Sequence, residues 1–218
     1  MSFFIRLIEA TDQQRRQLEL VPKLDRMIHK GLSKQEYISF LSDLYFIVWH
    51  FCPIMAAAAA RCDDSHRQIR FYLYKNIEEE MGHDQWVLDD LRFLGADPEA
   101  IKTQKPCAAV QAFIGYNYYY PEHVNPVGVI GMLYALEVVS SVYSGRVAHS
   151  IARNLSMKPD EGFGFLQSHS SMDLDHLANL NQLIKTIEVE DAQEAVINST
   201  NVNFYLLRQF LAGGSGGD

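Results

Sequence analysis

Apolar residues recur at spacings of three and four through almost all of this 218-residue chain, whereas the alternation of a half-buried strand is hard to find. The segment from Ser33 shows the pattern well. It opens with Ser33-Lys-Gln-Glu36, a capping box, and continues as an apolar stripe from Tyr37 to Phe51. The sequence therefore predicts an all-α fold, a single bundle of about seven helices.

Glycine and proline residues divide this pattern into segments. The breaks place helices over roughly residues 12–30, 33–60, 64–94, 106–120 and 191–211, with a short helix or turn at 97–99 and a kink at Pro53. A long helix that carries Glu137 begins near Pro126, and the helix of His169 begins near Lys158. With 48% apolar residues the chain can build one sizeable core, so we expect one domain over residues 1–212. Residues 213–218 have the composition of a flexible linker or an expression scar.

The charge pattern argues against several classes of partner. The net charge is −8 and Lys and Arg form no run, so the chain lacks the basic face that a nucleic acid or an anionic membrane requires. Charge interrupts the N-terminal apolar stretch too early for a signal peptide. The three cysteines show no CxxC spacing, which favours a reducing compartment. We expect a cytoplasmic protein that does not enter a membrane.

Three metal-competent side chains share one helix face in the segment from His169 to His176. His169, Asp173 and His176 stand at relative positions 0, 4 and 7, which on a helix lie within a sector of about 60°. On its own this pattern also fits a solvated helix face. If the face points inward, two imidazoles and a carboxylate reach one site.

A second group of candidate ligands lies upstream, in Glu78-Glu-Glu80-Met-Gly-His83. Glu80 and His83 form a Glu-x-x-His pair of the kind that holds metal ions in helical bundles. On one continuous helix Glu80 lies about 60° from His83 and Glu79 about 40°, so both glutamates can reach. We expect Glu80 to be the ligand, Glu79 to be the alternative, and Glu78 to point away.

Glu137 completes the set, because it stands within an apolar stretch where a carboxylate needs a partner. Together the three segments offer three imidazoles and three carboxylates, the donor set that holds two iron or manganese ions inside a bundle. An exposed Glu-x-x-His pair is common, so the coincidence of three segments carries the prediction.

The chain resembles the haem-oxygenase-like di-iron oxidases and oxygenases, relatives of the TenA-type thiaminases and of the pyrroloquinoline-quinone synthase fold. The resemblance rests on Tyr45–Pro53, on Asn76–His83 followed by Leu88, Leu91 and Gly95, on Glu137, and on the His-x3-Asp-x2-His pattern. Many members have a longer Glu-to-His spacing, and here that spacing falls on Asn76. The match to Glu80 therefore follows only the members with Glu-x-x-His.

The resemblance implies that two Fe(II) ions, or Mn in their place, bind to Glu80, His83, Glu137, His169, Asp173 and His176. It implies that Glu137 bridges the ions and is the residue on which catalysis most depends. O2 would be the co-substrate, and a small organic molecule, derived from an amino acid or like a fatty acid, would be oxidised in specialised metabolism. We also expect a homodimer. The alternatives are a metal-free enzyme acting on a heterocycle and a non-catalytic iron-binding bundle.

Overall fold

The computed structural model describes residues 2–158 and 161–213, and the side chains of residues 170–175 lie outside the described set. Within these ranges the chain forms ten α-helices, two short 3₁₀ helices and no strand. The α-helices are α1 (Phe3–Glu19), α2 (Pro22–His29), α3 (Lys34–Arg61), α4 (Arg67–Glu80), α5 (His83–Phe93), α6 (Pro98–Lys102), α7 (Ala108–His123), α8 (Val129–Leu155), α9 (Gly164–Ile184) and α10 (Glu190–Ala212), and the 3₁₀ helices are Asp64–His66 and Pro126–Gly128. The all-α prediction is confirmed, but seven helices were too few.

Two of the extra helices arise where the helical spacing of apolar residues continues in the sequence but the backbone leaves the helical conformation. The helix predicted over 12–30 is divided between α1 and α2, because Pro22 disfavours the helical conformation at Val21 before it. Its predicted start was wrong, since α1 begins nine residues earlier, at Phe3. The helix predicted over 64–94 is α4 and α5, which Met81 and Gly82 separate. Pro53, in contrast, lies inside the uninterrupted helix α3.

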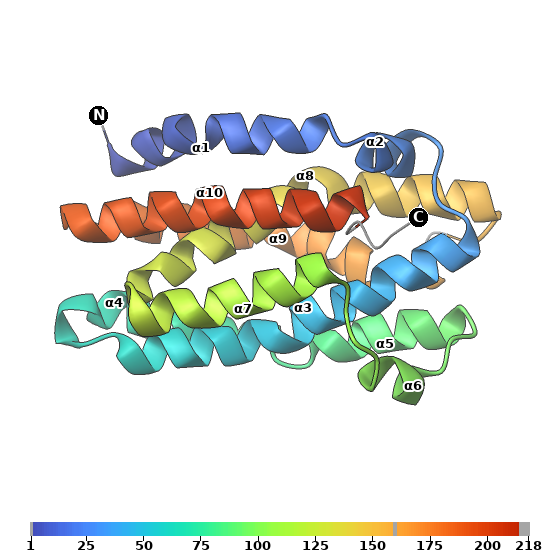
Figure 1. Cartoon of the computed structure of the whole chain (residues 1–218), viewed down its shortest axis with the longest axis horizontal. Helices are drawn as coiled ribbons and strands as arrows, with labels where there is room; N and C mark the ends of the chain where they lie inside the picture. Colours follow the sequence, from blue (N-terminus) through green and yellow to red (C-terminus); the bar gives the residue numbers. More distant parts are fainter. Residues whose placement is uncertain (1, 159–160, 214–218) are drawn as a thin grey trace.

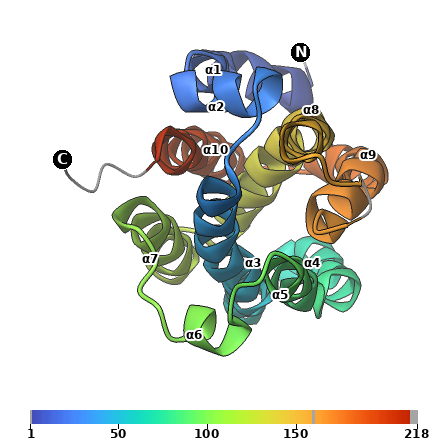
Figure 2. The ribbon, with the colours of Figure 1, turned by 90° about the vertical axis from the view of Figure 1, so that its right-hand side faces the viewer.

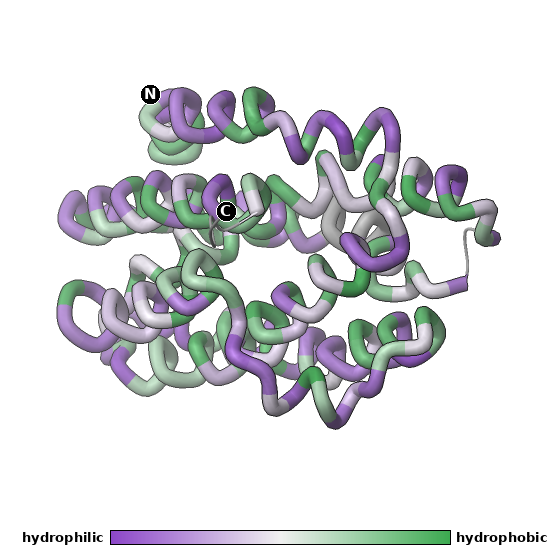
Figure 3. The backbone as a smooth tube through the Cα atoms, turned by 45° about the vertical axis from the view of Figure 1, so that its right-hand side comes forward, coloured by the Kyte–Doolittle hydropathy of each residue, from purple (hydrophilic) through white to green (hydrophobic). Residues whose placement is uncertain are grey.

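Helix α3 lies near the centre of the bundle, with α7 on one side and α4 and α5 on the other (Figure 2). Helix α10 lies between α1 and α7 (Figure 1). Along each helix, hydrophobic and hydrophilic residues follow one another every few positions, as an amphipathic helix requires (Figure 3). The predicted capping box at the start of α3 is confirmed, since Glu36 N–H donates to Ser33 Oγ and Ser33 N–H to Glu36 Oε2.

Helix α8 packs tightly against its neighbours. At Gly131 an added Cβ would lie 2.6 Å from the carbonyl oxygen of Val196 on α10, so only glycine permits this approach. By length and composition alone, α3 and the segment Pro126–Leu155 could each cross a membrane, and 33% and 61% of their most apolar windows are buried in the bundle. The core helices of a globular protein pass the same test. Beyond Gly213 the predicted tail lies outside the described residues.

Candidate metal centre

The turn between α4 and α5 brings Glu80 against His83. Glu80 ends α4, His83 begins α5, and Gly82 between them has a φ of 97°, which glycine adopts without strain. His83 Nδ1 lies 2.8 Å from Glu80 Oε2, and each residue is 5% exposed. The prediction of one continuous helix was wrong here, so the angular comparison of the glutamates does not apply. The two side chains nevertheless meet.

The three consecutive glutamates at the end of α4 face in different directions. Glu79 is exposed and its Oε1 lies 3.3 Å from Lys75 Nζ, while Glu78 is also exposed. Glu80 alone of the three is buried. The structure therefore turns Glu80 toward the bundle interior and leaves Glu79 at the surface.

Helices α8 and α9 bring further candidate ligands to the same place. Glu137 on α8 and His176 on α9 are each 8% exposed. His176 Nδ1 lies 3.4 Å from Glu80 Oε1 and 3.6 Å from Glu137 Oε1. The ring of His169 lies edge-on to that of His83, with ring centroids 5.0 Å apart. Residues from four helices thus converge on one buried volume.

These five residues, Glu80, His83, Glu137, His169 and His176, are called the ligand cluster below. They form two overlapping groups, Glu80–His83–His169 and Glu80–Glu137–His176, and within each group the ligand atoms lie within 4.8 Å of one another. Glu80 is common to both groups, whereas Glu137 belongs to one. The sixth predicted ligand is Asp173, whose side chain lies outside the described residues.

Packing fixes the imidazoles of the ligand cluster. The His83 ring stacks on Trp86, with ring centroids 3.9 Å apart, and the His169 ring lies 4.3 Å from that of Phe165. Asp90 on α5 accepts hydrogen bonds from the backbone N–H groups of Gly164 and Phe165, at 2.8 and 3.0 Å. This buried carboxylate anchors the start of α9 to α5, and so it sets the position of both α9 histidines.

The charges in the site act on one another. Burial by itself would raise the pKa of Glu80, but the hydrogen bond with His83 and the nearby imidazoles of His169, His83 and His176 outweigh it and lower that pKa. Burial and the carboxylates of Glu137, Glu79 and Glu80 raise the pKa of Tyr72, which stands two turns before Glu80 on α4. The Tyr72 phenol therefore keeps its proton at neutral pH.

A family profile described as iron-containing redox enzyme matches residues 38–202, three quarters of the chain. The chain belongs to this family. No curated protein sequence matches it. The predicted resemblance is thereby confirmed at the level of the family, and the description agrees with a donor set of imidazoles and carboxylates, which suits iron.

Solved structures confirm the haem-oxygenase-like fold. A domain of unknown function with a heme oxygenase-like fold from Shewanella denitrificans OS217 has a TM-score of 0.83 and 22% identity, covering 93% of this chain and 87% of that one. A TenA homologue from Pseudomonas syringae pv. tomato DC3000 has a TM-score of 0.77 and 14% sequence identity, and the match covers 94% of this chain and 89% of that one. Heme oxygenase from Leptospira interrogans has a TM-score of 0.70 and 16% sequence identity, and the match covers 97% of this chain and 99% of that one. At these identities the likeness shows the fold alone.

One buried acceptor near the ligand cluster has no hydrogen-bond partner among the described residues. Asn76 is 4% exposed, stands one turn before Glu80 on α4, and its Oδ1 accepts no hydrogen bond from the residues that the structure describes. A buried polar atom usually has a partner, and a metal ion or its bound water would supply one here. The sequence pattern does not mark Asn76 as a ligand, because only its burial and its open acceptor among the described residues single it out.

Proposed function

We propose that this chain is an O2-activating non-haem di-iron oxidase or oxygenase that acts on a small organic substrate. The observation that carries the proposal is the pair of overlapping three-residue groups that share Glu80. Two adjacent positions, each surrounded by imidazole and carboxylate, match the requirement of two ions held close together. Membership of the iron-containing redox enzymes supports iron as the metal.

In this proposal Glu80, His83 and His169 would hold one ion and Glu80, Glu137 and His176 would hold the other, with Asp173 as the proposed sixth ligand. Glu80 is better placed than Glu137 to lie between the ions, because it alone belongs to both groups. Iron bound there would supply the reduction of O2, with Mn(II) as the alternative ion. Tyr72 keeps its proton at neutral pH, and the packed rings of Trp86 and Phe165 shield the imidazoles from water.

The cysteines argue against a metal-free enzyme of the nucleophilic kind. Burial raises the pKa of Cys52 to about 11, with the charges of Glu80 and Asp84 adding to the effect. Burial also raises the pKa of Cys62 to about 11 and that of Cys107 in the same direction. A nucleophilic cysteine needs a lowered pKa, so none of the three thiols is activated. The metal-free alternative also leaves the ligand cluster without a role.

The proposal is tested by loading the protein with Fe(II) under anaerobic conditions and then measuring O2 consumption with candidate substrates. Glu137→Ala should abolish substrate-dependent O2 consumption, because one iron position loses its carboxylate. Circular dichroism should show that the bundle survives. Glu79→Gln, a change to an exposed glutamate, serves as the control. An unchanged rate in Glu137→Ala would refute the assignment.

That the protein is a homodimer and acts in the cytoplasm stays a prediction.

A further inference from the structure

A cavity of about 130 Å³ opens from the ligand cluster into the apolar core. Glu80, Glu137 and His169 line one end of it. The rest of its wall comes from α2, α3, α8, α9 and α10 and is mostly aliphatic and aromatic, including Leu24, Met27, Leu44, Val48, Leu166 and Leu207. The cavity therefore has one polar end and a long apolar body.

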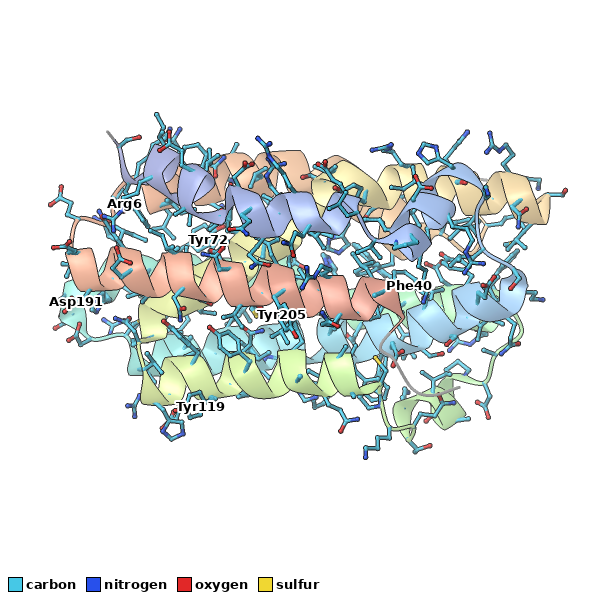
Figure 4. All side chains as sticks on the ribbon, turned by 45° about the horizontal axis from the view of Figure 1, so that its top comes forward. Arg6, Phe40, Tyr72, Tyr119, Asp191 and Tyr205 are labelled. Atoms are coloured by element: carbon cyan, nitrogen blue, oxygen red, sulfur yellow. The ribbon has the colours of Figure 1, made fainter. Side chains whose placement is uncertain are left out.

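The lining residues on α8 give the length of this cavity. They extend from Leu136 to Val147, and the part from the ligand Glu137 to Val147 covers about 15 Å at about 1.5 Å per residue. Helix α3 runs the other way beside it, since Asn154 near the end of α8 donates to the carbonyl oxygen of Leu32 just before α3. At the end far from the ligand cluster, Phe40 stacks on Phe210 with ring centroids 5.3 Å apart. Phe40 is labelled in Figure 4, beside the C-terminal end of α10.

Length and volume together define the shape of the molecule that fits. A cavity of roughly 150 Å³ holds a single benzene ring. This one has a similar volume spread over about 15 Å, so it is narrow. A narrow cavity accepts an extended chain and rejects a fused ring system. A haem macrocycle, the ligand of some proteins with this fold, is too wide for it.

The charges of the wall exclude a second class of ligand. No Lys or Arg lines the cavity among the residues that the structure describes. Ser140 and Ser144 on α8 bond to each other, with 2.9 Å between their hydroxyl oxygens. A free amino acid carries a carboxylate and an ammonium group, and burying either one without a partner is costly. Among the lining residues that the structure describes, the carboxylates and the imidazole, which can partner a charged group, lie at the end of the ligand cluster.

We propose that the substrate is an unbranched aliphatic molecule with one polar end, its hydrocarbon chain lying along α8 and its polar end at Glu80, Glu137 and His169. This inference rests on the proposed function for the identity of the reacting end. The cavity itself does not depend on iron, so the two proposals can fail separately.

The first experiment measures binding of 1-hexanol, 1-octanol and 1-decanol to the metal-free protein by calorimetry. Each methylene buried in the cavity should tighten binding about fourfold. Val147→Phe fills the far end of the cavity. It should weaken the binding of 1-decanol by about tenfold and leave the binding of 1-hexanol nearly unchanged. Val142→Phe is the matched control, because Val142 lies on the same helix but is 45% exposed. Val147→Ala, which lengthens the cavity without crowding it, should favour 1-decanol further.

The second experiment repeats the titration with hexanoate, octanoate and decanoate, with and without Mn(II). Tighter carboxylate binding with Mn(II) supports both proposals. A chain-length dependence for the alcohols without any effect of Mn(II) on the carboxylates supports the cavity and counts against the metal site. The inference is overturned if binding does not depend on chain length, if Val147→Phe and Val142→Phe behave alike, or if L-leucine binds more tightly than octanoate.

Discussion

Two clusters of polar side chains are buried in this bundle, and they differ in how their members are paired. In the amide cluster, formed by Asn117, Ser199 and Asn203 between α7 and α10, each asparagine Nδ2 donates to the Oδ1 of the other, at 2.7 and 3.1 Å. Asn203 Nδ2 also donates to the carbonyl oxygen of Ser199. Asn117 Nδ2 also donates to the carbonyl oxygen of Phe113. In the ligand cluster every member is ionisable, and the Oδ1 of Asn76 accepts no hydrogen bond from the part of the chain that the structure describes.

This difference separates structure from chemistry. A cluster of neutral amides that satisfy one another fixes the packing of two helices and has no use for a ligand. A cluster of carboxylates and imidazoles within 4.8 Å of one another is matched to a cation. Burial of polar groups alone therefore does not identify a functional site. If the two clusters are distinct, substitutions in one should change metal binding and substitutions in the other should change stability.

The largest effect is expected at the residue that both metal positions share. Glu80→Gln keeps the size of the side chain but removes its charge, so Fe(II) affinity should fall by about 100-fold or more. Equilibrium dialysis under anaerobic conditions measures it. Glu79→Gln is the matched control, since Glu79 is exposed and pairs with Lys75. A loss of affinity in Glu79→Gln with none in Glu80→Gln would reverse the assignment.

The amide cluster should respond in stability and not in metal content. Asn203→Leu leaves the Asn117 amide without its partner, so the free energy of unfolding should fall by about 3 kcal/mol. Urea denaturation measures it. Asn201→Leu, also on α10, is the control, because it breaks only an exposed hydrogen bond to the carbonyl oxygen of Ala10 and should cost less. Fe(II) affinity should stay at the wild-type value. Loss of iron in a folded Asn203→Leu protein would show that the two clusters are coupled.

A smaller effect on iron affinity is expected at Asn76, a neutral amide that lies beside the ligand cluster. Asn76→Leu removes a buried acceptor that has no partner among the described side chains, so the metal-free protein should keep or slightly gain stability. Fe(II) affinity should fall by about tenfold, because a group that supports the metal is lost. Parallel denaturation and dialysis measurements distinguish these effects. A destabilised protein with unchanged iron affinity would assign Asn76 a packing role only.

The smallest effect concerns pH. The pKa of Glu80 is lowered in the folded protein, so its ionised form stabilises the metal-free protein above its ordinary pKa of 4.5, and that contribution disappears as the pH falls through the folded value. The stability difference between wild type and Glu80→Gln should therefore shrink in acid. The difference between wild type and Asn203→Leu should not change with pH. Denaturation curves at neutral and acidic pH test both statements.

The sequence predicts the parts of this molecule that depend on local pattern. Helical periodicity was enough for the fold class, and the Ser33–Glu36 capping box was correctly located because both partners lie within one turn. The break at Gly82 was missed, because a single glycine does not reveal from sequence alone that it adopts a positive φ. Helix α9 was predicted to begin at Lys158 but begins at Gly164.

Contacts between distant segments limited the prediction of the site. Asp90 determines where α9 begins, yet it is 74 residues from Gly164 and nothing in its neighbourhood marks it as an anchor. The open acceptor of Asn76 and the effect of Glu137 on Tyr72 likewise depend on packing between helices. The types and spacing of His169, His176 and Glu137 were readable from the sequence, but their meeting at Glu80 required the fold.

The most direct test of this account is the number of irons bound per chain. Protein loaded with Fe(II) under anaerobic conditions and freed of excess metal should contain about two irons per chain, as expected for a carboxylate-bridged pair, and its Mössbauer spectrum should show two high-spin ferrous sites. Glu80→Gln should lose both sites, whereas Asn203→Leu should keep both while folded. One iron or none in the wild-type protein would contradict a two-iron site. Two irons in wild type that are both retained in Glu80→Gln would contradict a site shared at Glu80.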